Sequence, residues 1–156
     1  MIYLFFSLAF YYLATICDAI MDTVDFHFTT SIFNKIKSPK WRKWFNESEG
    51  WKNKYVDYDG DIAALMVPRR VKWNILGIEI NKPVQLTDSW HFFKMLQIAF
   101  ETVAITILVS LICYFIITPH FHIANFWDYF ISLTIGYGVT RNLLFSLFFD
   151  HILISK

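Results

Sequence analysis

The stretch that decides the fold is Met1–Phe28, MIYLFFSLAFYYLATICDAIMDTVDFHF. Its first seventeen residues carry no charged side chain. The run from Ile2 to about Met21 is long enough to cross the roughly 30 Å hydrocarbon layer of a bilayer at about 1.5 Å per residue. Because no basic segment opens this run, we expect it to remain as a first membrane-spanning helix rather than to be cleaved as a signal sequence.

The composition of the whole chain favours a membrane protein. Of its 156 residues, 56% are hydrophobic and 20% are aromatic, and the mean hydropathy is +0.40. A soluble domain of this length could not bury so much apolar surface, so lipid is the expected solvent for much of it. The formal net charge of +1 argues against a nucleic-acid partner. The two cysteines, Cys17 and Cys113, lie in separate apolar runs and are predicted to be inert buried thiols.

Acidic residues follow the first apolar run at helical spacing. Asp18, Asp22 and Asp25 are separated by four and three residues, which places them on one stripe of a helix. We predict that this helix becomes amphipathic and continues to about Lys37. His27 lies away from the acidic stripe on a regular helix and joins it only where the helix bends.

The segment 38–88 is predicted to be a small soluble insertion. The residue before a proline is disfavoured in the helical region, so Ser38 and Pro39 should end the first helix. Trp41 and Trp44 alternate with lysine and arginine, a mixture typical of a membrane surface with anionic headgroups.

A β-hairpin is predicted near the end of this insertion. The runs 71–75 and 78–81 both alternate between apolar and polar residues, and Leu76-Gly77 separates them. An isolated hairpin is marginally stable in water, so we expect it to pack on the helices or on the bilayer surface.

Two further motifs are weaker. The segment 57–61, DYDGD, begins like a calcium-binding loop, but Pro68 stands where the bidentate acid is needed, so a polar turn is favoured. His120 and His122, with Asp128 nearby, are predicted to form a solvated turn rather than a second site.

Two more spans complete the predicted fold, an all-α integral membrane protein with three transmembrane helices and one domain over 1–156. The spans cover about 2–21, 92–118 and 126–154. Twelve of the fourteen lysines and arginines lie between Lys35 and Lys94. The positive-inside rule therefore predicts a cytoplasmic insertion and an amino terminus outside, with a bacterial inner membrane as the favoured location.

The predicted spans bring ionisable groups to the same half of the bilayer. Such groups are costly in lipid and face the protein interior or a wet cavity. We predict that this cluster, on the cytoplasmic side, binds a divalent metal (magnesium, manganese, iron or zinc) and acts on or recognises a lipid headgroup. The candidate catalytic residues are Asp18, Asp22, Glu101 and Arg141; the candidate metal ligands are Asp22, Asp25, His27, Asp88 and His91; and the candidate lipid or phosphate contacts are Lys94, Arg141, Trp41 and Trp44.

Two alternatives stay open, and whether the chain is an enzyme stays open with them. In the first, Arg141 neutralises Asp18 or Asp22 and Glu101 pairs with Lys94, so that the charges only hold the helices of a non-catalytic accessory or oligomeric protein. In the second, an oligomer passes ions or protons. Gly-x-Gly at 136–138 permits a close helix contact between copies. No phosphate-binding glycine loop or catalytic triad order stands out.

Overall fold

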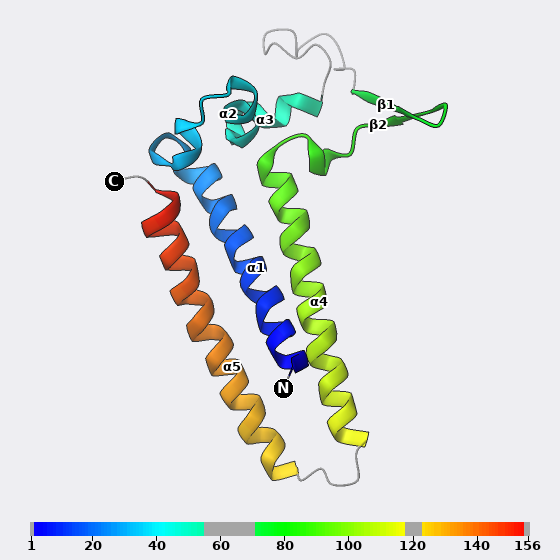
Figure 1. The fold of residues 1–156 in the computed structure, drawn as a ribbon, viewed down its shortest axis with the longest axis vertical. Helices are drawn as coiled ribbons and strands as arrows, with labels where there is room; N and C mark the ends of the chain where they lie inside the picture. The colour runs from blue at the N-terminus through cyan, green and yellow to red at the C-terminus, as the bar shows by residue number, and fades with distance from the viewer. Residues whose placement is uncertain (1, 55–70, 118–122, 155–156) are drawn as a thin grey trace.

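Three long helices form the body of the protein. The computed structural model describes residues 2–54, 71–117 and 123–154. Its long helices are α1 (Ile2–Phe26), α4 (Ser89–Ile117) and α5 (Ile123–Ser146), and α5 continues as a π-helical segment, Leu147–Leu153. Figure 1 shows α1 between α4 and α5, with the three axes nearly parallel. Helix α1 packs more extensively on α4 than on α5.

Two of the described helices are long and apolar enough to cross a membrane. The qualifying stretches are Tyr3–Phe26 in α1 and Ser89–Tyr114 in α4. Helix α5 covers most of the third predicted span. It is less apolar because its sequence includes Asp128, Arg141 and Asn142.

The prediction that the first helix continues to Lys37 is wrong. Helix α1 ends at Phe26, and the chain then makes two short 3-10 turns, Phe28–Thr30 and Ile32–Lys35. The side chain of Ser31 accepts a hydrogen bond from the backbone N–H of Phe33 at 3.2 Å. Serine and threonine side chains compete with helical hydrogen bonds in this way, and here they turn the chain back over the end of α1.

The apolar core lies at this same end of the helices. Its main cluster consists of Ala19, Val24, Phe33 and Leu153, with partly buried phenylalanines and isoleucines around them. The ring of Phe33 stacks on that of Phe45 with centroids 4.3 Å apart. Burying Phe33 between α1, the C-terminal segment and the following helix therefore explains why the chain turns here instead of extending.

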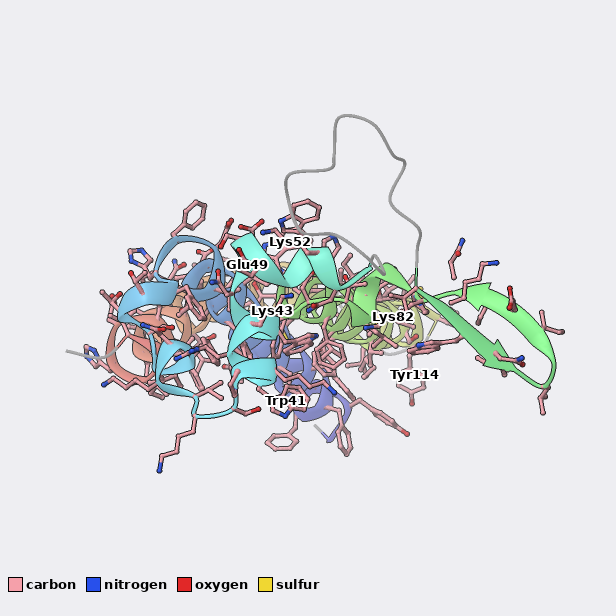
Figure 2. All side chains as sticks on the ribbon, turned by 90° about the horizontal axis from the view of Figure 1, so that it is seen from above. Trp41, Lys43, Glu49, Lys52, Lys82 and Tyr114 are labelled. Carbon is pink, nitrogen blue, oxygen red and sulfur yellow. The ribbon has the colours of Figure 1, made fainter. Side chains whose placement is uncertain are left out.

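Short helices cover the ends of α1 and α4. They are α2 (Pro39–Phe45), α3 (Glu47–Gly50) and a 3-10 turn, Trp51–Lys54; a further turn, Val84–Leu86, leads into α4. Pro39 occupies the first turn of α2, where its missing N–H costs nothing. Figure 2, which looks onto this end, shows α2 and α3 lying across the ends of the long helices.

The predicted hairpin is present. Strands β1 (Lys72–Ile75) and β2 (Ile78–Asn81) pair antiparallel. Leu76 and Gly77 have φ of 54° and 85°, the positive values of a type I′ turn. The hairpin projects sideways from the start of α4 (Figure 1), and among the described residues it has no extensive contact with a long helix.

Some sequence motifs fall outside these residues. The polar segment 57–61, His120, His122 and the side chain of Asp128 all lie outside the part of the chain that the structure describes.

Candidate functional site

An ion pair joins α1 to α5. Arg141 Nη2 lies 2.8 Å from Asp18 Oδ2, and both side chains are partly buried. The guanidinium of Arg141 also lies 6.0 Å from the centre of the Tyr11 ring. This pair agrees with the first alternative given above, in which Arg141 neutralises Asp18 or Asp22 and the charges only hold the helices together.

Gln97 extends this ion pair onto α4. Its Nε2 donates to Asp18 Oδ1 at 3.2 Å and to Glu101 Oε1 at 3.4 Å. Its Oε1 accepts a hydrogen bond from Lys94 Nζ at 2.9 Å. We call these five residues, Asp18, Lys94, Gln97, Glu101 and Arg141, the polar network. It contains two carboxylates, two cations and one neutral amide, so its formal charge is zero.

Gln97 was not among the candidate site residues. One alternative drawn from the sequence paired Glu101 directly with Lys94, whereas among the described residues the amide of Gln97 stands between them. Gln97 is 6% exposed and Ile98 is 54% exposed, so Gln97 faces α1. The available indication was spacing, since Gln97 lies three residues after Lys94 and four before Glu101.

A second polar contact joins the same three helices nearer the start of α1. Ser7 Oγ donates to the backbone oxygen of Ala104 at 2.9 Å and lies 2.9 Å from Tyr137 Oη. A serine hydroxyl has one proton, so Tyr137 is the donor to Ser7. The ring of Tyr137 also lies against that of Tyr11, with centroids 4.7 Å apart. None of the three residues of this polar contact was among the candidate site residues.

Asp88 and His91 meet at the start of α4. Asp88 Oδ1 accepts a hydrogen bond from the backbone N–H of His91 at 2.9 Å, so Asp88 is the N-cap residue of α4. His91 Nδ1 lies 2.9 Å from both carboxylate oxygens of Asp88. The hydroxyl of Thr87 donates to Asp88 Oδ2 at 2.9 Å. Two of the candidate metal ligands, Asp88 and His91, are therefore in direct contact.

Residues from α3 and the turn after it hold this N-cap in place. The amide of Asn53 donates to the backbone oxygen of Thr87 at 3.1 Å. Gly50 lies so close that a Cβ on it would be 2.8 Å from Asp88 Cβ and 2.9 Å from the backbone oxygen of Trp44. This close approach leaves Asp88 1% exposed.

The other candidate metal ligands lie at the end of α1. Asp22 is partly buried, and Asp25 and His27 are exposed. The ring of His27 lies edge-on to Phe149 with centroids 5.1 Å apart. Within residues 2–54, 71–117 and 123–154, no three His, Cys, Asp or Glu side chains gather closely enough to hold a metal ion.

The two candidate lipid-contacting tryptophans have different surroundings. Trp41 is 54% exposed on α2. Trp44 is partly buried, and its ring lies 5.7 Å from that of Phe92. Trp44 therefore attaches α2 to α4, whereas Trp41 lies on the exposed side of α2, and its ring is edge-on to that of Trp44 with centroids 5.7 Å apart.

Comparisons with protein-family models, with curated proteins and with solved structures found no match for this chain. Its function is therefore inferred from the contacts of its own residues.

Proposed function

We propose that this chain is a membrane protein of three membrane-crossing helices that acts as a non-catalytic component of a membrane assembly. The observation that carries this proposal is the polar network. Each of its four charged side chains contacts a partner in the same chain, and the charges balance. Charges in the bilayer are tolerated when they are paired in the protein interior, and such pairs hold helices in register.

Low burial of the long helices supports insertion into lipid. A core helix of a soluble protein is mostly buried, but only 33% of the apolar window of α1 and 11% of that of α4 are buried. Ile105 and Ile116 on α4 are 59% and 60% exposed. A bilayer would cover this surface, and α5 would cross beside α1 because Arg141 finds its counter-ion there.

The charge distribution supports a cytoplasmic location for segment 38–88. Most cations of the chain lie in or next to it, and the described ones on α2, Lys40, Arg42 and Lys43, are exposed. The opposite ends of α4 and α5 lack comparable basic clusters in the sequence. We infer the orientation from this asymmetry.

Open space on α5 supports assembly with other helices. A Cβ built on Gly136 or Gly138 would meet no atom of the described residues within 4 Å. Glycines on such a face let a second helix approach closely. The proposed assembly therefore uses α5 as a contact helix.

A double-mutant cycle in detergent or bilayer tests the structural role of the network. Arg141→Met alone leaves the carboxylate of Asp18 without its counter-ion and should lower the thermal unfolding temperature. Adding Asp18→Asn should restore much of the loss, because no unpartnered charge remains. Arg42→Met, which removes an exposed arginine, is the matched control. Additive effects of the two network substitutions would contradict the structural role.

A second candidate, a metal-assisted site that acts on a lipid headgroup, is favoured by the Asp88–His91 contact. A carboxylate that holds one nitrogen of an imidazole directs the other nitrogen to a metal, a common arrangement in metal sites. Elemental analysis of the purified protein beside His91→Ala and Asp22→Ala tests this candidate. Stoichiometric metal lost in both variants would support it. No metal in the folded parent, even after incubation with divalent cations, would reject it.

A further inference from the structure

The β-hairpin has one wholly apolar face and one wholly polar face. Its register pairs Trp73 with Ile80 and Ile75 with Ile78, and these four side chains share one face. The other face consists of Lys72, Asn74, Glu79 and Asn81. Lys72 and Glu79 form an ion pair of 2.8 Å there. We call the first set the apolar face and the second set the polar face.

Three of the four side chains of the apolar face are exposed in the described structure, and Trp73 is partly buried. Ile75, Ile78 and Ile80 are 46%, 66% and 38% exposed. A two-stranded hairpin is marginally stable in water unless such a face is covered. An amphipathic ribbon in this condition requires a covering surface.

Leu76, at the tip of the hairpin, also indicates that another surface covers the hairpin. It is 97% exposed and has a φ of 54°. Positive φ is uncommon outside glycine, asparagine and aspartate, and the first position of a type I′ turn favours asparagine. A large apolar side chain at a strained, fully exposed position is typical of a functional contact.

The position of the hairpin identifies what covers it. Asn81 ends β2 only a short turn before Ser89 begins α4 and its apolar stretch. Figures 1 and 2 agree that the hairpin extends sideways, beyond the area occupied by the three long helices. This inference rests on the proposed function. In the membrane orientation proposed there, the part of the hairpin that extends beyond the helices lies over lipid headgroups.

We infer that the hairpin is a lipid-binding element that lies flat in the headgroup layer of the bilayer. Its apolar face and Leu76 enter the boundary between headgroups and acyl chains, and its polar face stays in water. Trp73 belongs to the apolar face, and tryptophan is enriched at this depth in membrane proteins. The ion pair of Lys72 with Glu79 remains on the water side.

Site-directed fluorescence tests which face meets lipid. The full chain, with Cys17→Ala and Cys113→Ala, is reconstituted into vesicles of phosphatidylcholine and phosphatidylglycerol. Single cysteines introduced as Ile78→Cys, Leu76→Cys or Asn74→Cys carry an environment-sensitive dye. Nitroxide-labelled lipid should quench the dye at 78 and 76 several-fold more than at 74, and aqueous iodide should show the reverse order.

Ile105→Cys, on the exposed surface of α4, separates this inference from the proposed function. Lipid quenching at 105 with equal iodide quenching at 78 and 74 would overturn the hairpin inference alone. If nitroxide-labelled lipid does not quench the dye at position 105, the membrane-spanning proposal is overturned, and the hairpin inference with it. Protection at 78 from both quenchers would mean that a protein surface covers the apolar face, which also overturns the inference.

A tip substitution supplies an independent readout. Leu76→Asn keeps a residue that tolerates positive φ, so the turn is retained. In the Ile78→Cys protein it should lower quenching by nitroxide lipid several-fold while the circular dichroism spectrum is unchanged. Unchanged lipid quenching with the turn retained would show that Leu76 does not enter the lipid and would contradict its role.

Discussion

Arg141 and Asp18 are 123 residues apart in sequence and form an ion pair of 2.8 Å between α5 and α1. The second oxygen of the same carboxylate accepts a hydrogen bond from Gln97 on α4. One aspartate therefore contacts both neighbouring helices. In the proposed membrane setting, where charged groups need a nearby partner, these contacts would hold the three helices side by side.

Gln97→Leu should destabilise the protein although the two side chains are similar in size. The substitution removes the donor to Asp18 and Glu101 and the acceptor for Lys94. Leaving partly buried polar groups without a partner costs about 1–3 kcal/mol. Thermal unfolding in detergent measures the loss.

Ile98→Leu is the control for Gln97→Leu, because Ile98 is the exposed next residue on the same helix. It should change stability little. Equal stability of the Gln97→Leu protein and the parent would show that the amide does not link the helices.

Gly50→Ala should loosen the contact between α3 and the start of α4. The added methyl group would lie 2.8 Å from Asp88 Cβ and 2.9 Å from a backbone oxygen, so backbone must move. Overpacking of this kind costs about 1–3 kcal/mol. Chemical denaturation followed by tryptophan fluorescence measures it.

Gly136→Ala is the matched control, because its methyl group meets nothing within 4 Å among the described residues. In a helix interior it should be neutral or stabilising by about 0.5–1 kcal/mol in the isolated protein. If Gly50→Ala and Gly136→Ala changed the stability equally, the close approach of Gly50 to Asp88 would not require a glycine.

Asp88→Ala should destabilise the start of α4, whereas Asp88→Asn should preserve most of its stability. The carboxylate accepts a hydrogen bond from the backbone N–H of His91, and an asparagine oxygen can replace it. Loss of an N-cap side chain costs about 0.5–2 kcal/mol. Amide hydrogen exchange in the first turn of α4 reports this directly, and equal protection in both variants would contradict the capping role.

The stability of the hairpin should depend on pH through Glu79. The hydrogen bond and charge of Lys72 lower the pKa of Glu79 below its ordinary value. A lowered folded-state pKa contributes stability that is present above the ordinary glutamate pKa and is lost as pH falls through the folded value. Because Glu79 is fully exposed, the contribution is small.

An NMR titration of Glu79 in the full chain measures this pKa. Lys72→Gln should return the pKa toward that of a free glutamate. A Glu79 pKa that Lys72→Gln leaves unchanged would mean that the ion pair is absent in solution.

Local patterns predicted much of the architecture. The apolar runs predicted α1 and α4, because a stretch of about twenty predominantly apolar residues favours a helix in lipid. The alternation around Leu76-Gly77 predicted the hairpin, since residues two apart share a strand face and a two-residue loop selects a type I′ turn.

The tertiary structure decided which polar groups meet and where α1 ends. Spacing along one helix identified charged stripes, but the choice of Gln97 over Ile98 as the residue facing α1 depends on how α4 is rotated against α1. Helix α1 stops at Phe26 because Phe33 is buried against Phe45 and the C-terminal segment. The sequence alone thus determined the elements whose hydrogen bonds are local. Contacts between distant residues were decided by packing, because their energy depends on helix rotation and depth that no local pattern records.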